Sequence, residues 1–499
     1  MNAKHSVVRQ HLSHPVIDAD GHWLEFGPLV RERLRSIGGD RAVEGFASFP
    51  SLADEHLSMS VAERRRRRIA QQGFWGLPTK NTRDRATAIM PQLLYERLDE
   101  LGLDFSVMYP TAGLALPLIA DAETRRITCR AFNTFSAEYF RDVSDRLTPA
   151  AAIPMHTPDE AIAELEHAKQ LGLKVVMLGS MIRRQIPAVV QEQPEAAGLA
   201  AWYDVFGLDS EYDYDPVWAT CVELGFSPTF HSGGRGYGLR VSPSNFCYNH
   251  IGHFAVAGEA VCKALFLGGV TRRFPSLKFA FLEGGVGWAC QLYADLIEHW
   301  EKRNADALDE VNPDNLDVDL LRQLAATHGS QEIAAALTDR RAALDTARQP
   351  VGAAAVGGID NVDDFSACRI ENKQDFHELF ATKFYFGCEA DDRMNAWAFS
   401  RRHNPLGSQL NALFGSDIGH FDVADMAGVL PEAYELVEDG LMDADNFRDF
   451  VFTNPVRFWA EANPEFFTGT VVEHEAAALL AAAAPAVATN GGAVGQPSK

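Results

Sequence analysis

The stretch VIDADGHWLE, at residues 16–25, decides how the rest of the chain is interpreted. Its apolar start is typical of the end of a buried strand. Asp20 and His22 follow two residues apart, and in an extended chain residues i and i+2 point to the same side. Gly21 between them has no side chain that would obstruct a close approach. The stretch predicts either a pair of metal ligands at a strand end or an ordinary turn with a solvated Asp20. The positions of the other candidate ligands in the chain decide between these two interpretations.

The composition is that of a soluble globular protein. Hydrophobic residues make up 46% and charged residues 23% of the 499 residues. The formal net charge of -23 argues against nucleic acid and anionic membrane surfaces as partners. The seven cysteines are odd in number and form no C-x-x-C pair, which favours reduced thiols and a cytoplasmic location. We see no signal peptide and, outside the Ala-rich C-terminal stretch, no apolar run long enough to span a membrane.

Three segments share one pattern, in which a helix ends in Leu-Gly and an apolar strand follows. Gly102, Gly172 and Gly225 stand at these helix ends, where the left-handed conformation of glycine closes a helix. The second of these helices also has a start signal, because TPDE at residues 157–160 supplies an N-cap, a proline and the glutamate of a capping box. Repeated helix-then-strand units of this size predict a parallel sheet.

Buried strand candidates recur eight times along the chain, which is the strand count of a closed (β/α)8 barrel. They lie near residues 15–19, 104–109, 149–154, 173–178, 226–231, 277–283, 383–388 and 412–417. A doubly wound open sheet is the main alternative. Its dinucleotide-binding form is disfavoured, because no G-x-G-x-x-G follows the first strand. We therefore predict an α/β fold of the TIM-barrel type.

Two connections between the predicted strands are too long to be simple crossover helices. Residues 23–90 separate the first two strands and residues 288–380 separate the sixth and seventh, so helical insertions that form a cap or an oligomer contact are expected there. The predicted organisation is an N-terminal arm at 1–14, a barrel at 15–470 and a tail at 471–499. This tail is rich in Ala and Gly and is predicted to be disordered.

Metal-capable side chains stand at the ends of four predicted strands. In barrels of this kind the catalytic residues lie at the carboxyl ends of the strands. These ends carry Asp20 and His22, His231, Glu283, and Asp417. Imidazoles together with carboxylates form a mixed nitrogen and oxygen set that suits Zn2+, Mn2+ or a similar divalent ion. Each residue alone would more often be structural, but their coincidence at four strand ends predicts one metal site.

These motifs resemble the amidohydrolase superfamily, and within it the branch of aminocarboxymuconate-semialdehyde decarboxylase and the resorcylate and carboxyvanillate decarboxylases. The resemblance extends from about residue 15 to residue 467 and is carried by DADGH at 18–22, FH at 230–231, GGV at 268–270, RFPSLK at 273–278, EGG at 283–285, and SD at 416–417 with His420. It implies a distorted (β/α)8 barrel with one divalent metal ion, zinc being expected first and manganese or magnesium being alternatives. Asp20, His22, His231 and Asp417 match the ligand positions of the family.

Two departures from the family pattern bear on the mechanism. Asp20 takes a place that is often histidine in the superfamily, and Glu283 takes a place that is often histidine in this branch. Glu283 is therefore left open as a general base, a ligand or a residue that orients another. Asp417 is expected to act as the acid or base, and His420 either orients Asp417 or caps the local loop. Arg235, in a glycine-rich loop after the fifth strand, is a candidate clamp for a substrate carboxylate or an ordinary surface arginine.

The sequence as a whole is interpreted as a cytoplasmic, metal-dependent enzyme that acts on a small carboxylated, aromatic or cyclic organic molecule. Non-oxidative decarboxylation is placed ahead of hydrolysis of a C–N, C–O or C–C bond on the resemblance alone, because both chemistries use the same metal shell. A catalytically inactive barrel that serves as a binding protein is the third hypothesis. A homodimer is expected from the resemblance and from the long insertions.

Overall fold

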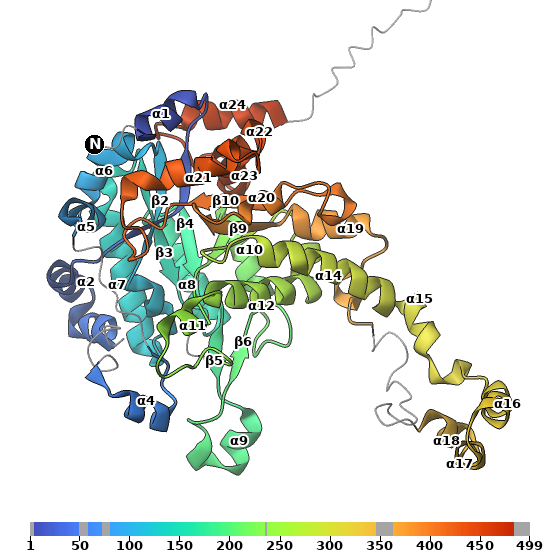
Figure 1. Ribbon diagram of the computed structural model, residues 1–499. Coiled ribbons are helices and arrows are strands. Elements are labelled where there is room, and N and C mark those ends of the chain that lie inside the picture. The colour runs from blue at the N-terminus through green and yellow to red at the C-terminus, as the bar shows by residue number, and fades with distance from the viewer. Residues whose placement is uncertain (1–3, 49–57, 72–79, 235–236, 346–362, 484–499) are drawn as a thin grey trace, which may run out of the picture.

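The computed structural model describes residues 4–48, 58–71, 80–234, 237–345 and 363–483, and every structural statement concerns these residues. Eight strands form the centre of the molecule, and each is parallel to its neighbours (Figure 1). In their order around the sheet they are β1 (Ile17–Trp23), β2 (Phe105–Pro110), β3 (Leu147–Ile153), β4 (Val175–Leu178), β7 (Pro228–Phe230), β8 (Phe279–Phe281), β9 (Phe384–Glu389) and β10 (Asn411–Gly415). These strands overlap all eight predicted segments, so the predicted (β/α)8 barrel is confirmed.

The barrel closes where β10 meets β1. The backbone amide of Asp417 donates a hydrogen bond to the carbonyl of Asp20 over 3.0 Å, and the amide of His22 donates to the carbonyl of Ile418, also over 3.0 Å. The register between β1 and β2 shifts between Asp18 and Gly21. A bulge of this kind re-aims the side chains around it. The closure and the bulge both lie at the segment that bears Asp20 and His22.

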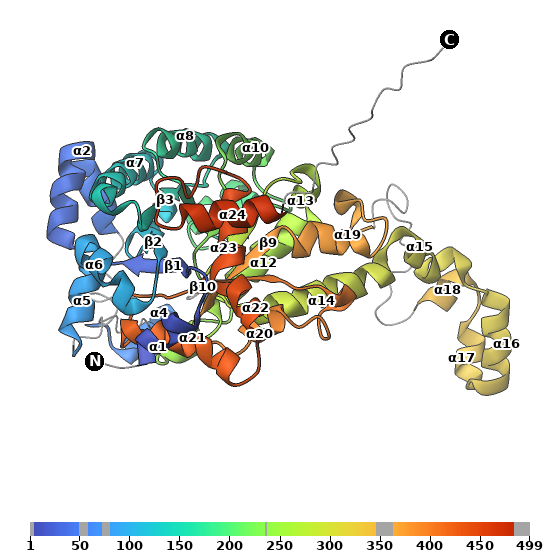
Figure 2. The same ribbon diagram turned by 90° about the horizontal axis from the view of Figure 1, so that it is seen from above.

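Helices surround the barrel and fill the connections between its strands (Figures 1 and 2). Before β2 they are α1 (Lys4–His11), α2 (Gly27–Ser48), α4 (Val61–Arg67), α5 (Thr82–Ile89) and α6 (Pro91–Leu101). Between β2 and β8 they are α7 (Ala122–Tyr139), α8 (Pro158–Gln170), α9 (Pro187–Glu192), α10 (Asp215–Leu224), α11 (Phe246–His250), α12 (His253–Leu267) and α13 (Val270–Arg273). From β8 onward they are α14 (Gly287–Arg303), α15 (Ala305–Leu308), α16 (Val318–His328), α17 (Gln331–Ala336), α18 (Arg340–Leu344), α19 (Gln374–Phe376), α20 (Asn395–Ala398), α21 (Val429–Glu438), α22 (Ala444–Arg448), α23 (Asn454–Ala460) and α24 (Glu473–Ala483).

Aromatic side chains fill the layer between the strands and the outer helices. Phe230 and Phe281 stack with their ring centroids 5.5 Å apart, and Phe281 lies 6.0 Å from Trp288 of α14. Successive residues of a strand point to opposite faces. Because Phe230 packs on Phe281 in this layer, the next residue, His231, points to the inside of the barrel.

The predicted helix ends are confirmed. Gly102, Gly172 and Gly225 have φ angles of 79°, 76° and 73°, in the left-handed region that glycine adopts without strain. At the start of α8, the hydroxyl of Thr157 accepts a hydrogen bond from the backbone amide of Glu160 over 3.2 Å. The predicted capping signal thus satisfies one of the amides that a helix start leaves without a partner.

Replacing Thr157 by alanine is expected to weaken the start of α8 by about 1 kcal/mol, because the Glu160 amide loses its acceptor. Hydrogen–deuterium exchange in the first turn of α8 should become about fivefold faster. The change Thr157→Ser keeps the hydroxyl and is the control. Equal exchange rates in wild type and Thr157→Ala would show that the cap contributes nothing.

Both long connections are helical in their described residues, as predicted, and α16, α17 and α18 lie at the end of the molecule farthest from the barrel strands in both views (Figures 1 and 2). A third insertion was not predicted. It consists of β5 (Ile182–Arg184), which pairs antiparallel with β6 (Trp202–Asp204) outside the barrel sheet. Whether the helical insertions form a cap or an oligomer contact stays a prediction.

The C-terminal region differs in part from its prediction. Disorder was expected throughout residues 471–499, but α24 is a helix, and residues 484–499 lie outside the described part of the chain. The division into arm, barrel and tail therefore stays a prediction. The seven cysteines are unpaired, as predicted. Among the described helices, none is both long and apolar enough to cross a membrane.

Candidate metal centre

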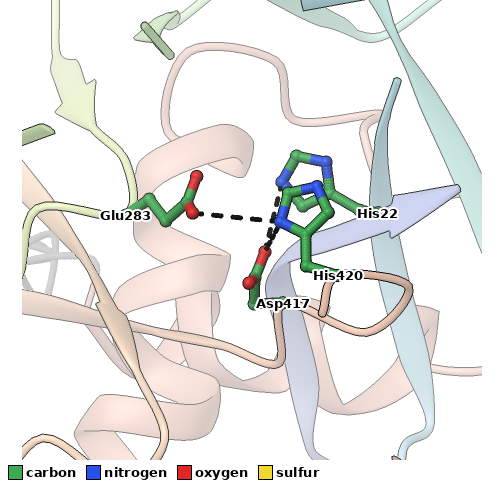
Figure 3. Close-up of side chains that lie close together, drawn as sticks. All are labelled: His22, Glu283, Asp417 and His420. Carbon is green, nitrogen blue, oxygen red and sulfur yellow. Dashed lines mark ion pairs between the residues drawn. The ribbon is translucent and has the colours of Figure 1, made fainter. Parts of the chain in front are cut away.

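Six side chains that bear metal-capable groups meet at the carboxyl ends of the barrel strands. β1 supplies Asp20 and His22, the residue after β7 is His231, Glu283 lies just beyond β8, and the loop after β10 supplies Asp417 and His420. Five of the six were predicted from their place at a strand end, and His420 was expected from the family resemblance as a neighbour of Asp417. Figure 3 shows four of them, His22, Glu283, Asp417 and His420, with their polar atoms directed toward one another.

Three donor atoms form a nearly equilateral triangle at the centre of this cluster. The Nε2 atoms of His22 and His231 are 3.0 Å apart, and the Oδ1 atom of Asp20 is 3.4 Å from each of them. Both imidazoles are fully buried. Asp20 and His22 therefore reach the same point, as the spacing of two residues along an extended chain predicted.

Two further carboxylates flank the triangle. The Oδ1 atom of Asp417 is 3.6 Å from Nε2 of His22, and the Oε2 atom of Glu283 is 3.4 Å from Nε2 of His231. The two acids therefore occupy equivalent places, each beside one imidazole. Five donor atoms are linked in this way by distances of 3.0–3.6 Å.

His420 lies over one side of the cluster and contacts Asp417. Its Nδ1 atom is 2.5 Å from Oδ1 of Asp417 and 3.9 Å from Oε1 of Glu283 (Figure 3). Its ring stacks on that of His22 with centroids 3.9 Å apart. The other ring nitrogen, Nε2, is 3.3 Å from the hydroxyl of Thr111. The His420 side chain is 16% exposed, more than the 0–6% of the five side chains beneath it, so it links the buried acids to the solvent side.

Both flanking acids have a strained backbone. Glu283 has φ 59° and Asp417 has φ 48°, in the left-handed region that costs a residue with a side chain roughly 1–2 kcal/mol. Such conformations persist where the surrounding structure imposes them, and they cluster at functional sites. Here they turn each carboxylate off the strand end and toward the two imidazoles.

A buried carboxylate that was not predicted, Asp18, holds this region together. Its Oδ2 accepts hydrogen bonds from the hydroxyls of Ser106 and Ser416 over 2.6 and 2.7 Å, and its Oδ1 accepts from the backbone amides of Ser416 and Asp20 over 2.9 and 3.2 Å. Asp18 thus ties β1 to β2 and β10, next to Asp20 and Asp417. A Cβ atom at Gly21 would lie 2.6 Å from both Oδ2 of Asp18 and Oγ of Ser106, so only glycine fits there.

Burial and mutual repulsion set the electrostatics of the cluster. Burial, with the nearby charges of Asp422 and Asp20, raises the pKa of Asp417 well above its usual value. Burial and the charge of Asp417 do the same to the pKa of Glu283. Burial and the neighbouring His420 lower the pKa of His22 to about 3. A pocket that holds carboxylates so close together with neutral imidazoles favours a bound cation.

Burial also shifts the pKa values of His420 and Asp18. Burial lowers the pKa of His420, and the charges of Asp422 and Asp20 oppose that shift. Burial raises the pKa of Asp18 to about 6, although its hydrogen bonds from Ser106 and Ser416 act in the opposite direction.

The donor spacing fits one metal ion. With bonds of about 2.0–2.2 Å, two ligand atoms on the same ion stand roughly 2.8–3.6 Å apart. The five distances between donor atoms, 3.0–3.6 Å, fall in this range. Within the described residues, Oδ1 of Asp20 and Oε2 of Glu283 are buried and have no hydrogen-bond partner. Among the described residues, two potential metal-binding groups share His22: one consists of Asp20, His22 and His231, and the other of His22, Glu283, Asp417 and His420.

One predicted site residue is not placed. Arg235 lies outside the described residues, and its role as a clamp for a substrate carboxylate stays a prediction. The residues that sequence reasoning missed are Asp18 and Thr111. Asp18, Asp20 and His22 occupy every second position of β1. This spacing could have identified Asp18 from the sequence. Thr111 offered none, because it meets His420 only in the folded protein.

One comparison with known protein families gives a match. A family model described as amidohydrolase matches residues 17–353, more than half of the chain. No curated protein matches the sequence.

Solved structures similar to this one include three from bacteria. An amidohydrolase from Mycobacterium avium subsp. paratuberculosis is 16% identical, with a TM-score of 0.48, and the match covers 90% of this chain and 100% of the other. A 5-carboxyvanillate decarboxylase from Novosphingobium aromaticivorans with bound manganese is 12% identical, with a TM-score of 0.46 and coverage of 90% and 97%. A dihydroxybenzoic acid decarboxylase from Polaromonas sp. JS666, also with bound manganese, is 14% identical, with a TM-score of 0.47 and coverage of 91% and 99%.

Proposed function

This chain belongs to the amidohydrolase family and is a metal-dependent enzyme of that family, and from this premise we propose that it catalyses the non-oxidative decarboxylation of a small carboxylated or aromatic substrate. The proposal rests on one observation, the cluster of donor atoms at the carboxyl end of the barrel, whose neighbours lie 3.0–3.6 Å apart. The preference for decarboxylation over hydrolysis comes from the sequence motifs that resemble the decarboxylase branch.

Asp20, His22, His231 and Asp417 are proposed to hold one divalent metal ion. When bound, the ion supplies a Lewis acid that can fix and polarise a carboxylate or hydroxyl group of the substrate. Zinc was expected first from the sequence, with manganese or magnesium as alternatives, and the identity of the metal stays a prediction. The convergence of all four predicted ligands argues against the hypothesis of an inactive barrel.

Asp417 and His420 are proposed to handle the proton of the reaction. In decarboxylation the bond between the substrate carbon and its carboxyl group breaks, CO2 leaves, and the electron pair stays on the carbon, which then takes a proton. Asp417 is buried in the cluster, and His420 touches it through a contact of 2.5 Å while remaining partly exposed. This arrangement lets His420 pass a proton from solvent to Asp417, and Asp417 pass it to the carbon.

The substrate is proposed to be a small molecule, because the reacting groups lie inside the end of the barrel. The expected homodimer, the cytoplasmic location and the expected absence of nucleic-acid and membrane partners stay predictions from the sequence.

Isotope labelling distinguishes decarboxylation from hydrolysis. The full-length enzyme, loaded with Mn2+ or Zn2+, is incubated with a panel of hydroxylated benzoic acids and related small carboxylic acids in 18O-labelled water and, separately, in D2O. We expect one CO2 released per product molecule, deuterium on the product carbon, and no 18O in the organic product. The change Asp417→Asn should abolish turnover. Incorporation of 18O into the organic product would establish a hydrolase and reject the decarboxylase proposal.

A further inference from the structure

We infer that Glu283 binds the metal directly, as a fifth protein ligand beside Asp20, His22, His231 and Asp417, and that this set selects an oxygen-preferring ion such as Mn2+ over Zn2+. The inference rests on the metal site proposed above. Of the three roles that the sequence allows Glu283, this is the role of a ligand, and Glu283 then does not act as a general base.

The position of Glu283 in the cluster matches that of a proposed ligand. Its Oε2 atom is 3.4 Å from Nε2 of His231, whereas Oδ1 of Asp417 is 3.6 Å from Nε2 of His22. The distance from Asp20 to His231 is likewise 3.4 Å. Glu283 is therefore at least as close to the imidazole of His231 as Asp417 is to the imidazole of His22. In Figure 3 the carboxylates of Glu283 and Asp417 both point toward the imidazoles of His22 and His420.

The Glu283 carboxylate lies 3.4 Å from Nε2 of His231 and 3.9 Å from Nδ1 of His420. Its side chain is only 5% exposed, and among the described residues Oε2 has no hydrogen-bond partner. The backbone is nevertheless held at φ 59°, which turns the carboxylate inward at a cost in free energy. Burying a carboxylate oxygen without a hydrogen bond costs free energy, and a bond to a cation would offset that cost.

The donor set that includes Glu283 has three carboxylates and two imidazoles. Zn2+ prefers four ligands rich in nitrogen and sulfur, whereas carboxylate-rich sets with more ligands suit Mn2+ and Mg2+. A histidine at position 283, as the family pattern expects, would supply a neutral nitrogen instead. The acid at this position therefore shifts the site toward harder ions.

Affinity and coordination number test the inference without any substrate. Mn2+ and Zn2+ affinities are measured by competition with a chelator for the full-length protein and for Glu283→Gln. Loss of a direct ligand should lower Mn2+ affinity at least about 10–100-fold, with a smaller loss for Zn2+. In the Co2+-loaded protein, the visible absorption should become more intense in Glu283→Gln, because fewer ligands strengthen these bands.

Two variants separate coordination from charge and from misfolding. Glu389→Gln removes the carboxylate at the end of β9, which lies outside the potential metal-binding groups, and should leave the Co2+ spectrum unchanged with a much smaller loss of Mn2+ affinity. Glu283→His should shift the preference from Mn2+ toward Zn2+. Thermal melting of the metal-free proteins shows whether each variant is folded, and Glu283→His carries the test if Glu283→Gln is not.

Different results would contradict the inference about Glu283 and the proposed function. An unchanged Co2+ spectrum and an unchanged ratio of Mn2+ to Zn2+ affinity in both Glu283 variants would overturn the inference, while the proposed four-ligand site would stand. Equal losses in Glu283→Gln and Glu389→Gln would also overturn it, because the effect would then be one of charge. Failure of the wild-type protein to bind any divalent ion would instead overturn the proposed function.

Discussion

Replacing His231 by alanine is expected to remove the metal from the protein and to abolish activity. The imidazole of His231 lies between two carboxylates, 3.4 Å from Asp20 and 3.4 Å from Glu283, and is 3.0 Å from His22. Its loss removes one proposed ligand and also the ring that separates two acids. Changes to residues that merely support ligands lower metal affinity about 10–100-fold, so the loss of a ligand should cost at least as much. Elemental analysis should find about one divalent ion per wild-type chain and far less in His231→Ala.

Two further variants make this measurement specific. Asp417→Asn should lose metal in the same way, because the amide keeps the shape of the side chain but not its charge. His156→Gln is the control, since His156 follows β3 and is outside both potential metal-binding groups. A His231→Ala protein with the full metal content would place the metal elsewhere in the molecule. Metal-free wild-type protein, even after reconstitution, would remove the basis of the proposed enzyme mechanism.

Replacing Asp18 by alanine is expected to destabilise the barrel by at least about 3 kcal/mol and to weaken metal binding about 10–100-fold. Four buried donors, the hydroxyls of Ser106 and Ser416 and the amides of Ser416 and Asp20, would lose their acceptor. They come from β1, β2 and the residue after β10, so the seam that closes the barrel would loosen. Asp20 and Asp417 lie on either side of that seam. Urea unfolding of the metal-free protein and chelator competition measure the two effects.

The matched control for this change is Asp18→Asn. Its amide oxygen can still accept from the two backbone amides, and its NH2 group can donate to the two hydroxyls, which turn to accept. The loss of stability should therefore be less than half that of Asp18→Ala. Unfolding and metal affinity equal to wild type in Asp18→Ala would mean that the seam holds without this carboxylate.

Much of the fold was predictable because its signals are local. Helix ends at Gly102 and Gly225 and the cap at Thr157 depend on a few neighbouring residues, and all three have the expected geometry. The pair Asp20 and His22 was predictable for the same reason, since the geometry of an extended chain places both side chains on one side. The antiparallel pair β5 and β6 was missed because each strand has three residues, too few to show a periodic pattern.

The cluster itself was predictable as a set of residues but not as a geometry. Position at a strand end identified Glu283 and Asp417, but their left-handed backbone, which brings each carboxylate to an imidazole, is imposed by the surrounding structure. The contact between His420 and Thr111 joins residues far apart in the sequence, so no local pattern predicts it. Arg235 and its role as a substrate clamp remain a prediction.

The closure of the barrel between β1 and β10 determines when the enzyme can first become active during its synthesis. Asp20 and Asp417 are separated by 397 residues, and a ribosome that adds about 5–20 residues per second needs roughly 20–80 s to make the chain between them. Until β10 is made, β1 has one open edge, and Asp20, His22 and His231 lack the last proposed ligand. Pairing of such distant segments is also slow, because the entropy of closing a long loop is lost before the contacts form. We therefore expect the complete set of proposed ligands to form only in the final step of folding, when the first strand joins the last.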